Sequence, residues 1–207
     1  MESQTIETPG GRTKIRVYQG GSGEPLLYLH GLWGVFKDDP FLAALAQRYT
    51  VYAPMLPGFA GSEGESSLRE VLDFALHGFD VIEALGLSKP LLVGHSLGGM
   101  IAAEMAAIAP NEVPRLALVS PFGLWLDEHP IPDLFAMTFG SWPEVLFTDV
   151  DANEHTLLQG GNPKDLDFAR DFMINNARTM GLAGKLLFRS PTADSRTGST
   201  ASRPGRS

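Results

Sequence analysis

Residues 89–110 read KPLLVGHSLGGMIAAEMAAIAP, and the rest of the chain is organised around this stretch. Leu91 to Val93 form a short apolar run, as expected for a buried strand. From Met100 to Ile108 the chain is rich in Ala, Met and Ile, which indicates a helix. Ser96 stands between these two segments in the pattern Gly-x-Ser-x-Gly. The stretch therefore predicts a strand, a sharp turn and a helix, with a serine at the tip of the turn.

The glycines around Ser96 follow from what such a turn requires. A serine at its tip is forced into strained backbone angles, so Gly94 and Gly98, two positions before and after it, must lack a side chain. This geometry would expose the Ser96 hydroxyl and point the Leu97 amide at the space in which a substrate oxyanion forms. The N-terminus of the following helix favours that negative charge. A chance glycine-rich turn between a strand and a helix is the alternative interpretation.

The composition limits the classes of partner. The chain has 207 residues, of which 43% are hydrophobic and 19% charged, so it can bury a core. Its formal charge of −8 argues against nucleic acid and anionic membranes as partners. We find no signal peptide and no membrane span, and expect a cytoplasmic protein that acts on a small molecule. The absence of cysteine excludes disulfides and a thiol nucleophile, and we expect neither a metal nor a cofactor.

Apolar segments at strand and helix spacing alternate along the first 120 residues. Besides the stretch around Ser96, we expect strands at 13–18, 26–29, 49–53 and 116–119, and helices at 41–46 and 68–85. The alternating pattern at 13–18 indicates an edge strand, whereas 26–29 and 116–119 are uniformly apolar, like strands buried on both faces. The predicted fold class is α/β, with a doubly wound and mostly parallel sheet.

Four motifs, in this order, resemble the α/β-hydrolase family in its serine-nucleophile branch. They are His30-Gly31, Leu56-Pro57-Gly58-Phe59 with Gly61-Ser62, Gly94-His95-Ser96-Leu97-Gly98-Gly99, and Val119-Ser120-Pro121. The resemblance implies that Ser96 is the nucleophile and that the Leu97 and Leu32 amides form the oxyanion hole. It also implies packing roles for His30 and His95. The dehalogenase and epoxide-hydrolase branches carry an aspartate in place of Ser96, so both are excluded.

The resemblance also divides the chain. Residues 1–124 would be the α/β-hydrolase core, 125–188 a helical cap over the nucleophile, and 189–207 a disordered tail. The cap segment is rich in aromatic and methionine side chains, which would either form a pocket for a small apolar or aromatic substrate or only pack the cap onto the core. In the tail, Ala193 and Ala201 are the only apolar side chains, too few to order it.

A serine hydrolase also needs a histidine base and an acid that orients it. In the family these follow the seventh and eighth strands, and no segment of this chain matches either strand. His77 lies off the apolar face of its helix and is expected in solvent, while His129 and His155 fall in the cap segment and match no family base. Asp127 is the candidate acid, with a solvated loop carboxylate as the alternative.

We interpret the chain as a C-terminally truncated α/β-hydrolase. If one base is inserted after the Phe188 codon, suitably chosen codons for the tail can be read as FPIPDRGLANRLHRI, which resembles the family's continuation. This suggests a frameshift, and a naturally short protein with a disordered tail is the alternative.

Two functions follow from this interpretation. The first is a serine hydrolase acting on an ester, thioester or carbon–carbon bond, and the second is a non-catalytic α/β-hydrolase-like fragment or a protein that binds a small ligand. Without further strands, 116–119 would be an exposed apolar edge, through which we expect self-association.

Overall fold

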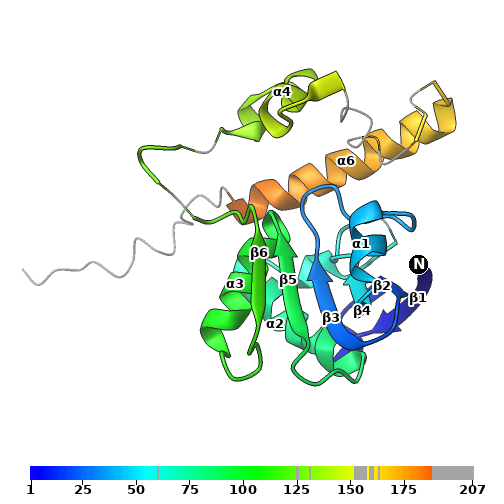
Figure 1. The fold of residues 1–207 in the computed structure, drawn as a ribbon. Helices are drawn as coiled ribbons and strands as arrows, with labels where there is room; N and C mark the ends of the chain where they lie inside the picture. Colours follow the sequence, from blue (N-terminus) through cyan, green and yellow to red (C-terminus); the bar gives the residue numbers. More distant parts are fainter. Residues whose placement is uncertain are drawn as a thin grey trace, which may run out of the picture.

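A six-stranded sheet forms the centre of the molecule (Figure 1). The computed structural model describes residues 1–59, 61–124, 126–130, 132–151, 158, 161–162 and 164–187. The strands are β1 (Glu2–Glu7), β2 (Lys14–Gly20), β3 (Glu24–Leu29), β4 (Tyr49–Pro54), β5 (Leu91–His95) and β6 (Leu116–Val119), in the order β1-β2-β4-β3-β5-β6. β2 is antiparallel to both of its neighbours. The other four strands, which lie side by side in the order β4-β3-β5-β6, are parallel to one another. The predicted α/β class with a mostly parallel sheet is confirmed.

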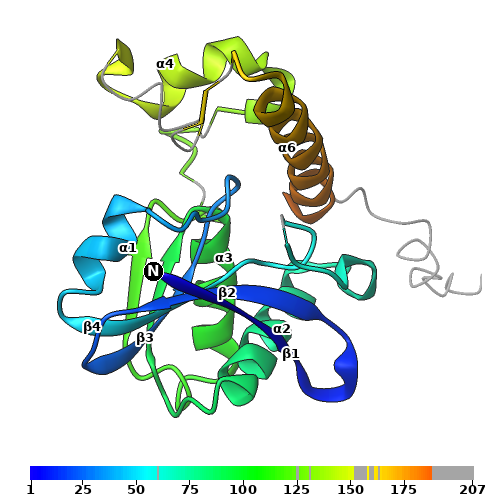
Figure 2. The same ribbon diagram turned by 90° about the vertical axis from the view of Figure 1, so that its right-hand side faces the viewer.

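Helices cover both faces of the sheet (Figure 2). α2 (Val71–Ala84) and α3 (Leu97–Ile108) pack together on one face, and α1 (Pro40–Leu45) lies on the other. The Asp39 carboxylate begins α1 by accepting hydrogen bonds from the amides of Phe41 and Leu42. This two-sided cover buries the apolar strands β3 and β5, as a doubly wound sheet requires.

The segment after residue 125 lies beyond the C-terminal ends of the parallel strands. It contains α4 (Trp142–Leu146) and α6 (Leu166–Leu187), and α6 crosses the strand ends with α4 beyond it (Figures 1 and 2). Short 3-10 turns occupy Pro9–Gly11, Glu65–Ser67, Leu134–Ala136 and Phe139–Ser141. None of the described helices combines the length and the apolar content needed to cross a membrane. The boundary between core and cap stays a prediction, and the predicted tail lies outside the described residues.

Helix α6 packs on the core through its C-terminal half. Leu182, Ala183 and Leu186 are buried in the main core. Leu166 and Met173, in the N-terminal half of α6, are exposed.

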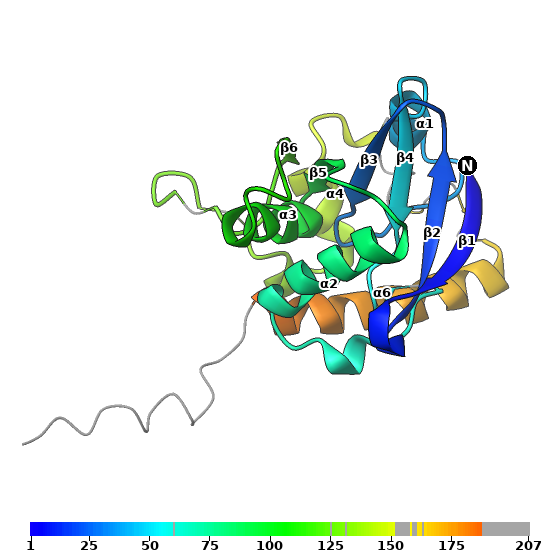
Figure 3. The same cartoon turned by 90° about the horizontal axis from the view of Figure 1, so that it is seen from below.

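The structure corrects the position of one sheet edge. β2 was expected at the edge, but β1 pairs beside it along its whole length, from Glu2 opposite Gln19 to Glu7 opposite Lys14. The sequence of β1, ESQTIE, has Ile6 as its only apolar residue and so carries no alternating pattern. Figure 3 shows β1 and β6 at opposite ends of the sheet.

The other edge is β6, whose bounds were predicted but whose burial was not. Leu116, Leu118 and Val119 are 36–40% exposed, so the expected burial on both faces is wrong. The expectation of an uncovered apolar edge agrees with the structure, since no strand among the described residues pairs with the outer side of β6.

His77 is buried rather than solvated, which corrects the prediction for this residue. Its side chain is 3% exposed, and its Nε2 lies 2.9 Å from Thr13 Oγ1. Thr13 Oγ1 in turn lies 2.7 Å from Thr8 Oγ1, so the three side chains connect α2 to the turn between β1 and β2. Burial, helped by the positive charge of Arg12, lowers the pKa of His77 to about 4 and keeps the imidazole neutral.

Candidate active site

Ser96 occupies the turn between β5 and α3 in a strained backbone conformation. Its φ of 53° and ψ of −118° are rare for a residue with a side chain. Three backbone hydrogen bonds hold it. The Ser96 amide donates to the Val119 carbonyl at 3.0 Å, and the Ser96 carbonyl accepts from the amides of Phe122 at 3.0 Å and Met100 at 3.1 Å. The conformation of the serine therefore depends on the end of β6 as well as on α3.

The glycines of the motif make this close packing feasible. A Cβ on Gly94 would lie 2.5 Å from the Gly98 carbonyl oxygen, and a Cβ on Gly98 would overlap the Leu29 carbonyl. A Cβ on Gly99 would lie 2.8 Å from Pro121 Cβ. Gly94 and Gly98 thus act as the sequence predicted, and Gly99 lets the segment after β6 approach the turn.

Two backbone amides near Ser96 are available to an oxyanion. The loop after β3 passes directly beside the serine, because a Cβ on Gly31 would lie 3.0 Å from Ser96 Cβ and 3.0 Å from His95 Nδ1. Among the described residues, no acceptor receives a hydrogen bond from the amide of Leu32 or of Leu97. Leu97 is also the first residue of α3, where the helix dipole favours negative charge. Both amides can therefore serve as the predicted oxyanion hole.

His30 holds the loop after β3 in place. Its Nε2 accepts a hydrogen bond from the Leu56 amide at 2.9 Å, so Nδ1 carries the proton and donates to the Gly31 carbonyl at 2.7 Å. The ring is fully buried and packs edge-on against Phe59. Burial lowers the pKa of His30 to about 4. With both nitrogens engaged, His30 positions the loop and has no free nitrogen to act as a base.

Ser96 opens into a cavity of about 390 Å³, which we call the serine cavity. It is lined by Leu32, Trp33, His95, Ser96, Ser120, Pro121, Phe122, Pro132, Leu134, Val145 and Leu146. Most of these side chains are apolar, and they come from loops after β3, β5 and β6 and from α4. His95 is the one titratable side chain in this lining, and burial lowers its pKa although Asp39 acts in the opposite direction. The cavity thus suits an uncharged, apolar group.

The other candidate residues are not brought to Ser96. Asp127 and His129 are exposed and do not line the serine cavity, and His77 belongs to the network under β1 and β2. His155 lies outside the described residues. Within the described ranges, no group of three or more His, Asp or Glu side chains could hold a metal ion. In the described part of the chain, Ser96 and the Leu32 and Leu97 amides thus lie together, and none of the predicted base or acid candidates lines the serine cavity beside them.

Sequence reasoning missed most of the cavity wall. Trp33, Leu134 and Leu146 come from three separate segments, and only Trp33, which directly follows the His30-Gly31-Leu32 stretch, stood next to a motif.

A family model described as alpha/beta hydrolase fold matches residues 24–173. The chain belongs to the α/β-hydrolase family. Its fold, its strained serine and the order of its motifs agree with this membership.

Curated proteins and solved structures resemble parts of this chain. The dihydrolipoyllysine-residue acetyltransferase component of the acetoin cleaving system of Cupriavidus necator is 36% identical over 110 residues, 51% of this chain and 28% of that protein. Carboxylesterase YbfK of Bacillus subtilis is 31% identical over 133 residues, 62% of this chain and 44% of that protein. The crystal structure of a bacterial membrane phospholipase A has the same fold, with a TM-score of 0.65 and 24% identity over 89% of this chain and 62% of that one. This α/β-hydrolase chain thus spans less than half the length of either curated relative.

Proposed function

We propose that this chain carries the nucleophile, oxyanion hole and acyl pocket of a serine hydrolase that acts on an ester or thioester of a small apolar or aromatic acid. The observation that carries the proposal is the strained Ser96, which faces an apolar cavity of about 390 Å³ beside the amides of Leu32 and Leu97. Backbone strain at a serine that lines a cavity indicates a reactive group.

The proposed reaction starts with attack of Ser96 Oγ on the substrate carbonyl carbon. The hydroxyl proton leaves to a base as the new C–O bond forms, and the negative carbonyl oxygen is held by the amides of Leu32 and Leu97. Collapse of this intermediate breaks the bond to the alcohol or thiol, which takes up a proton, and leaves an acyl group on Ser96. Water then releases the acid and restores the serine.

Esters and thioesters fit the described residues better than the carbon–carbon bond that was also expected. Alcohols and thiols with a low pKa leave without strong help from an acid, whereas a carbanion leaving group needs protonation. The name of carboxylesterase YbfK states ester hydrolysis, which supports this choice for the chain. Without a base, the oxyanion hole and binding together supply on the order of 10³–10⁴-fold over water.

The alternative is a non-catalytic chain that binds a small apolar ligand. It is favoured by one observation, that His95 is the only titratable side chain in the lining of the serine cavity. Burial lowers the pKa of His95, and Asp39, which acts in the opposite direction, is not among the side chains that line the serine cavity.

The test uses two serines that share one cavity. Ser96 and Ser120 both line the serine cavity and both have positive φ, so Ser120→Ala is a matched control for Ser96→Ala. We expect weak labelling by a fluorophosphonate probe and slow hydrolysis of p-nitrophenyl butyrate, both lost in Ser96→Ala and retained in Ser120→Ala. If Ser96→Ala changes neither signal, the nucleophile is wrong and the ligand-binding alternative stands.

The rate of ester hydrolysis decides whether the chain contains a base. Rapid Ser96-dependent turnover, comparable to that of a complete hydrolase, would show that the chain does contain a working base. His95→Gln would then be the first variant to measure, followed by His129→Gln and His155→Gln.

A further inference from the structure

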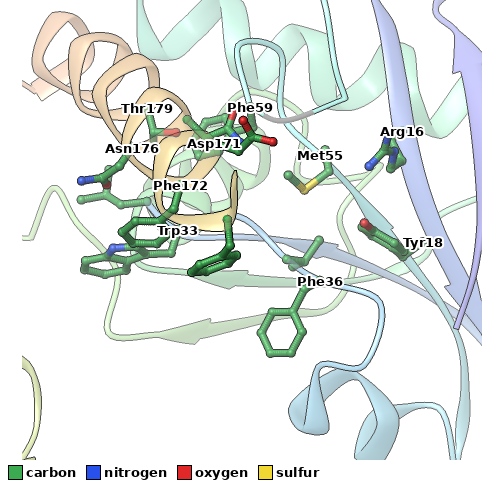
Figure 4. Close-up of a pocket in the computed structure, with 14 residues that line it drawn as sticks. Arg16, Tyr18, Trp33, Phe36, Met55, Phe59, Asp171, Phe172, Asn176 and Thr179 are labelled. Atoms are coloured by element: carbon green, nitrogen blue, oxygen red, sulfur yellow. The ribbon is translucent and has the colours of Figure 1, made fainter. Parts of the chain in front are cut away.

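A second cavity, of about 250 Å³, lies between helix α6 and the sheet, and we call it the arginine cavity. Met55 and Phe59 line it from the loop after β4, and Phe172 and Thr179 line it from α6 (Figure 4). Arg16 of β2 lies at its rim next to Tyr18. The cavity therefore combines apolar side chains with one basic group, one carboxylate (Asp171) and the amide side chains of Asn175 and Asn176.

The Arg16 side chain is held in a definite position. Its guanidinium packs on the backbone of Gly61, since a Cβ there would lie 2.5 Å from Arg16 Cζ and 2.7 Å from Nη2. The Arg16 amide donates to Ser62 Oγ at 3.1 Å, and its carbonyl accepts from the Met55 amide at 2.8 Å. The loop after β4 thus fixes both the backbone and the charged end of this residue.

No anion in the described part of the chain satisfies this charge. Among the residues that the structure describes, no carboxylate lies within ion-pair distance of the Arg16 guanidinium. The other charged side chain in the lining, Asp171 of α6, pairs with Arg170 at 3.1 Å and is largely exposed. Arg16 is therefore free to bind an anion that enters the cavity.

The two cavities meet beside the oxyanion loop. Leu32 and Trp33 line both the arginine cavity and the serine cavity. Arg16 stands opposite the C-terminal end of β4, and the β3–β5 register places the end of β3 beside Gly94, just before Ser96. In the strand order β2-β4-β3-β5 they are three strands apart, a span of about 14 Å.

We propose that Arg16 binds a carboxylate at the far end of the substrate, so that the preferred ligands are long, apolar acyl chains that end in a carboxylate. A planar guanidinium matches a carboxylate with two parallel hydrogen bonds, and a single cation balances the single charge of a carboxylate better than a doubly charged phosphate. This inference rests on the proposed function, because the ester end of such a ligand lies at Ser96.

The experiment measures binding, so that it does not depend on turnover. In the Ser96→Ala protein, calorimetry compares monomethyl sebacate, which carries one carboxylate, with dimethyl sebacate, which carries none. We expect the monoester to bind about tenfold more tightly, the effect of one charge-assisted contact. Adding Arg16→Gln should make the two affinities equal, whereas adding Arg12→Gln should leave the difference intact. Arg12 is a suitable control because it pairs with Asp80 and lines neither cavity.

The length of the ligand's acyl chain provides a second measurement in the parent protein. Monomethyl succinate is too short to reach from Arg16 to Ser96, so it should bind more weakly than monomethyl sebacate by at least about tenfold. Equal or undetectable binding of the two sebacate esters, or a difference that survives Arg16→Gln, would overturn the inference. A difference that follows Arg16 in a protein whose Ser96 never reacts with fluorophosphonate would retain the anion site and reject the hydrolase.

Discussion

The two edges of the sheet have opposite chemistry. β1 reads ESQTIE, with a glutamate at each end and Ile6 as its only apolar side chain, a composition typical of natural edge strands that face water. β6 reads LALV, without a polar or charged side chain, and it is equally uncovered in the described part of the chain. β1 has the composition of an edge strand and β6 that of an interior strand. From this difference we propose that a second copy of the chain associates with β6.

The largest expected effect separates the interior of the sheet from this edge. Leu27 in β3 is fully buried, whereas Leu118 in β6 is 37% exposed. Leu27→Ala should lower the free energy of unfolding by about 3 kcal/mol, and Leu118→Ala by less than about 1 kcal/mol, because little is buried around it. Urea denaturation of dilute protein measures both. A loss at Leu118 as large as that at Leu27 would show that β6 is already covered in solution.

Acid should lower the free energy of unfolding through His77, on the β1 side of the molecule. His77 links α2 to the turn after β1 and has a pKa of about 4, below its value of about 6.5 in an unfolded chain. Its contribution is complete above pH 6.5 and is lost as the pH falls from there toward 4, because the unfolded state takes up the proton first. At pH 5 this costs about 2 kcal/mol for His77, and as much again for His30, whose pKa is also about 4.

The variant His77→Gln isolates this contribution, since Gln can bond to Thr13 without titrating in this range. The decrease in unfolding free energy between pH 7 and pH 5 should be roughly halved in this variant. An unchanged pH dependence would mean that folding does not lower the pKa of His77.

A charge on each edge tests self-association directly. Leu118→Lys gives β6 the kind of side chain that natural edge strands use against pairing, and Ser3→Lys places the same charge on β1. We expect light scattering at tens of micromolar protein to show association of the parent chain. Leu118→Lys should raise the apparent dissociation constant about tenfold or more, and Ser3→Lys should leave it unchanged. A parent chain that is monomeric at these concentrations would remove the expectation.

The smallest effect concerns the ion pair that joins β6 to β3. Arg115, directly before β6, pairs with Glu24 at the start of β3, and the hydrogen bond from Arg115 lowers the pKa of Glu24. Both side chains are about half exposed, and solvent weakens such pairs. Glu24→Gln should therefore leave the unfolding midpoint at pH 7 unchanged within error. A clear decrease would mean that this contact, rather than packing, holds β6 on the sheet.

The turn at Ser96 and the sheet could be predicted because the local sequence determines them. Gly94, Ser96 and Gly98 are required by one turn, and the interior strands are continuous apolar runs. β1 was missed because an edge strand in water needs no apolar pattern.

His77 was misplaced because the buried face of α2 mixes the large apolar Phe74 and Val81 with small and polar residues, including His77 and Gly78. Gly78, next to His77, lies against Met105 of α3, where a Cβ would lie 2.5 Å from Met105 Sδ. Leu72, which the helical spacing placed on the apolar face, is exposed, and so is the large apolar Leu76. Close helix packing at a glycine thus turns the helix in a way that hydrophobic spacing does not show. The two cavities were equally out of reach, since each is built from segments that are distant in the sequence.

The hydrogen bonds between Ser96 and the end of β6 couple the conformation of the serine to that of the sheet edge. The Ser96 amide donates a hydrogen bond to the carbonyl of Val119, the last residue of β6. The Phe122 amide donates one to the Ser96 carbonyl. A partner that restrains β6 therefore also restrains the strained serine, and a ligand that fixes the serine also fixes the strand. Because such coupling is reciprocal, acylation of Ser96 should tighten association at β6 by the same factor by which association favours the acylated state.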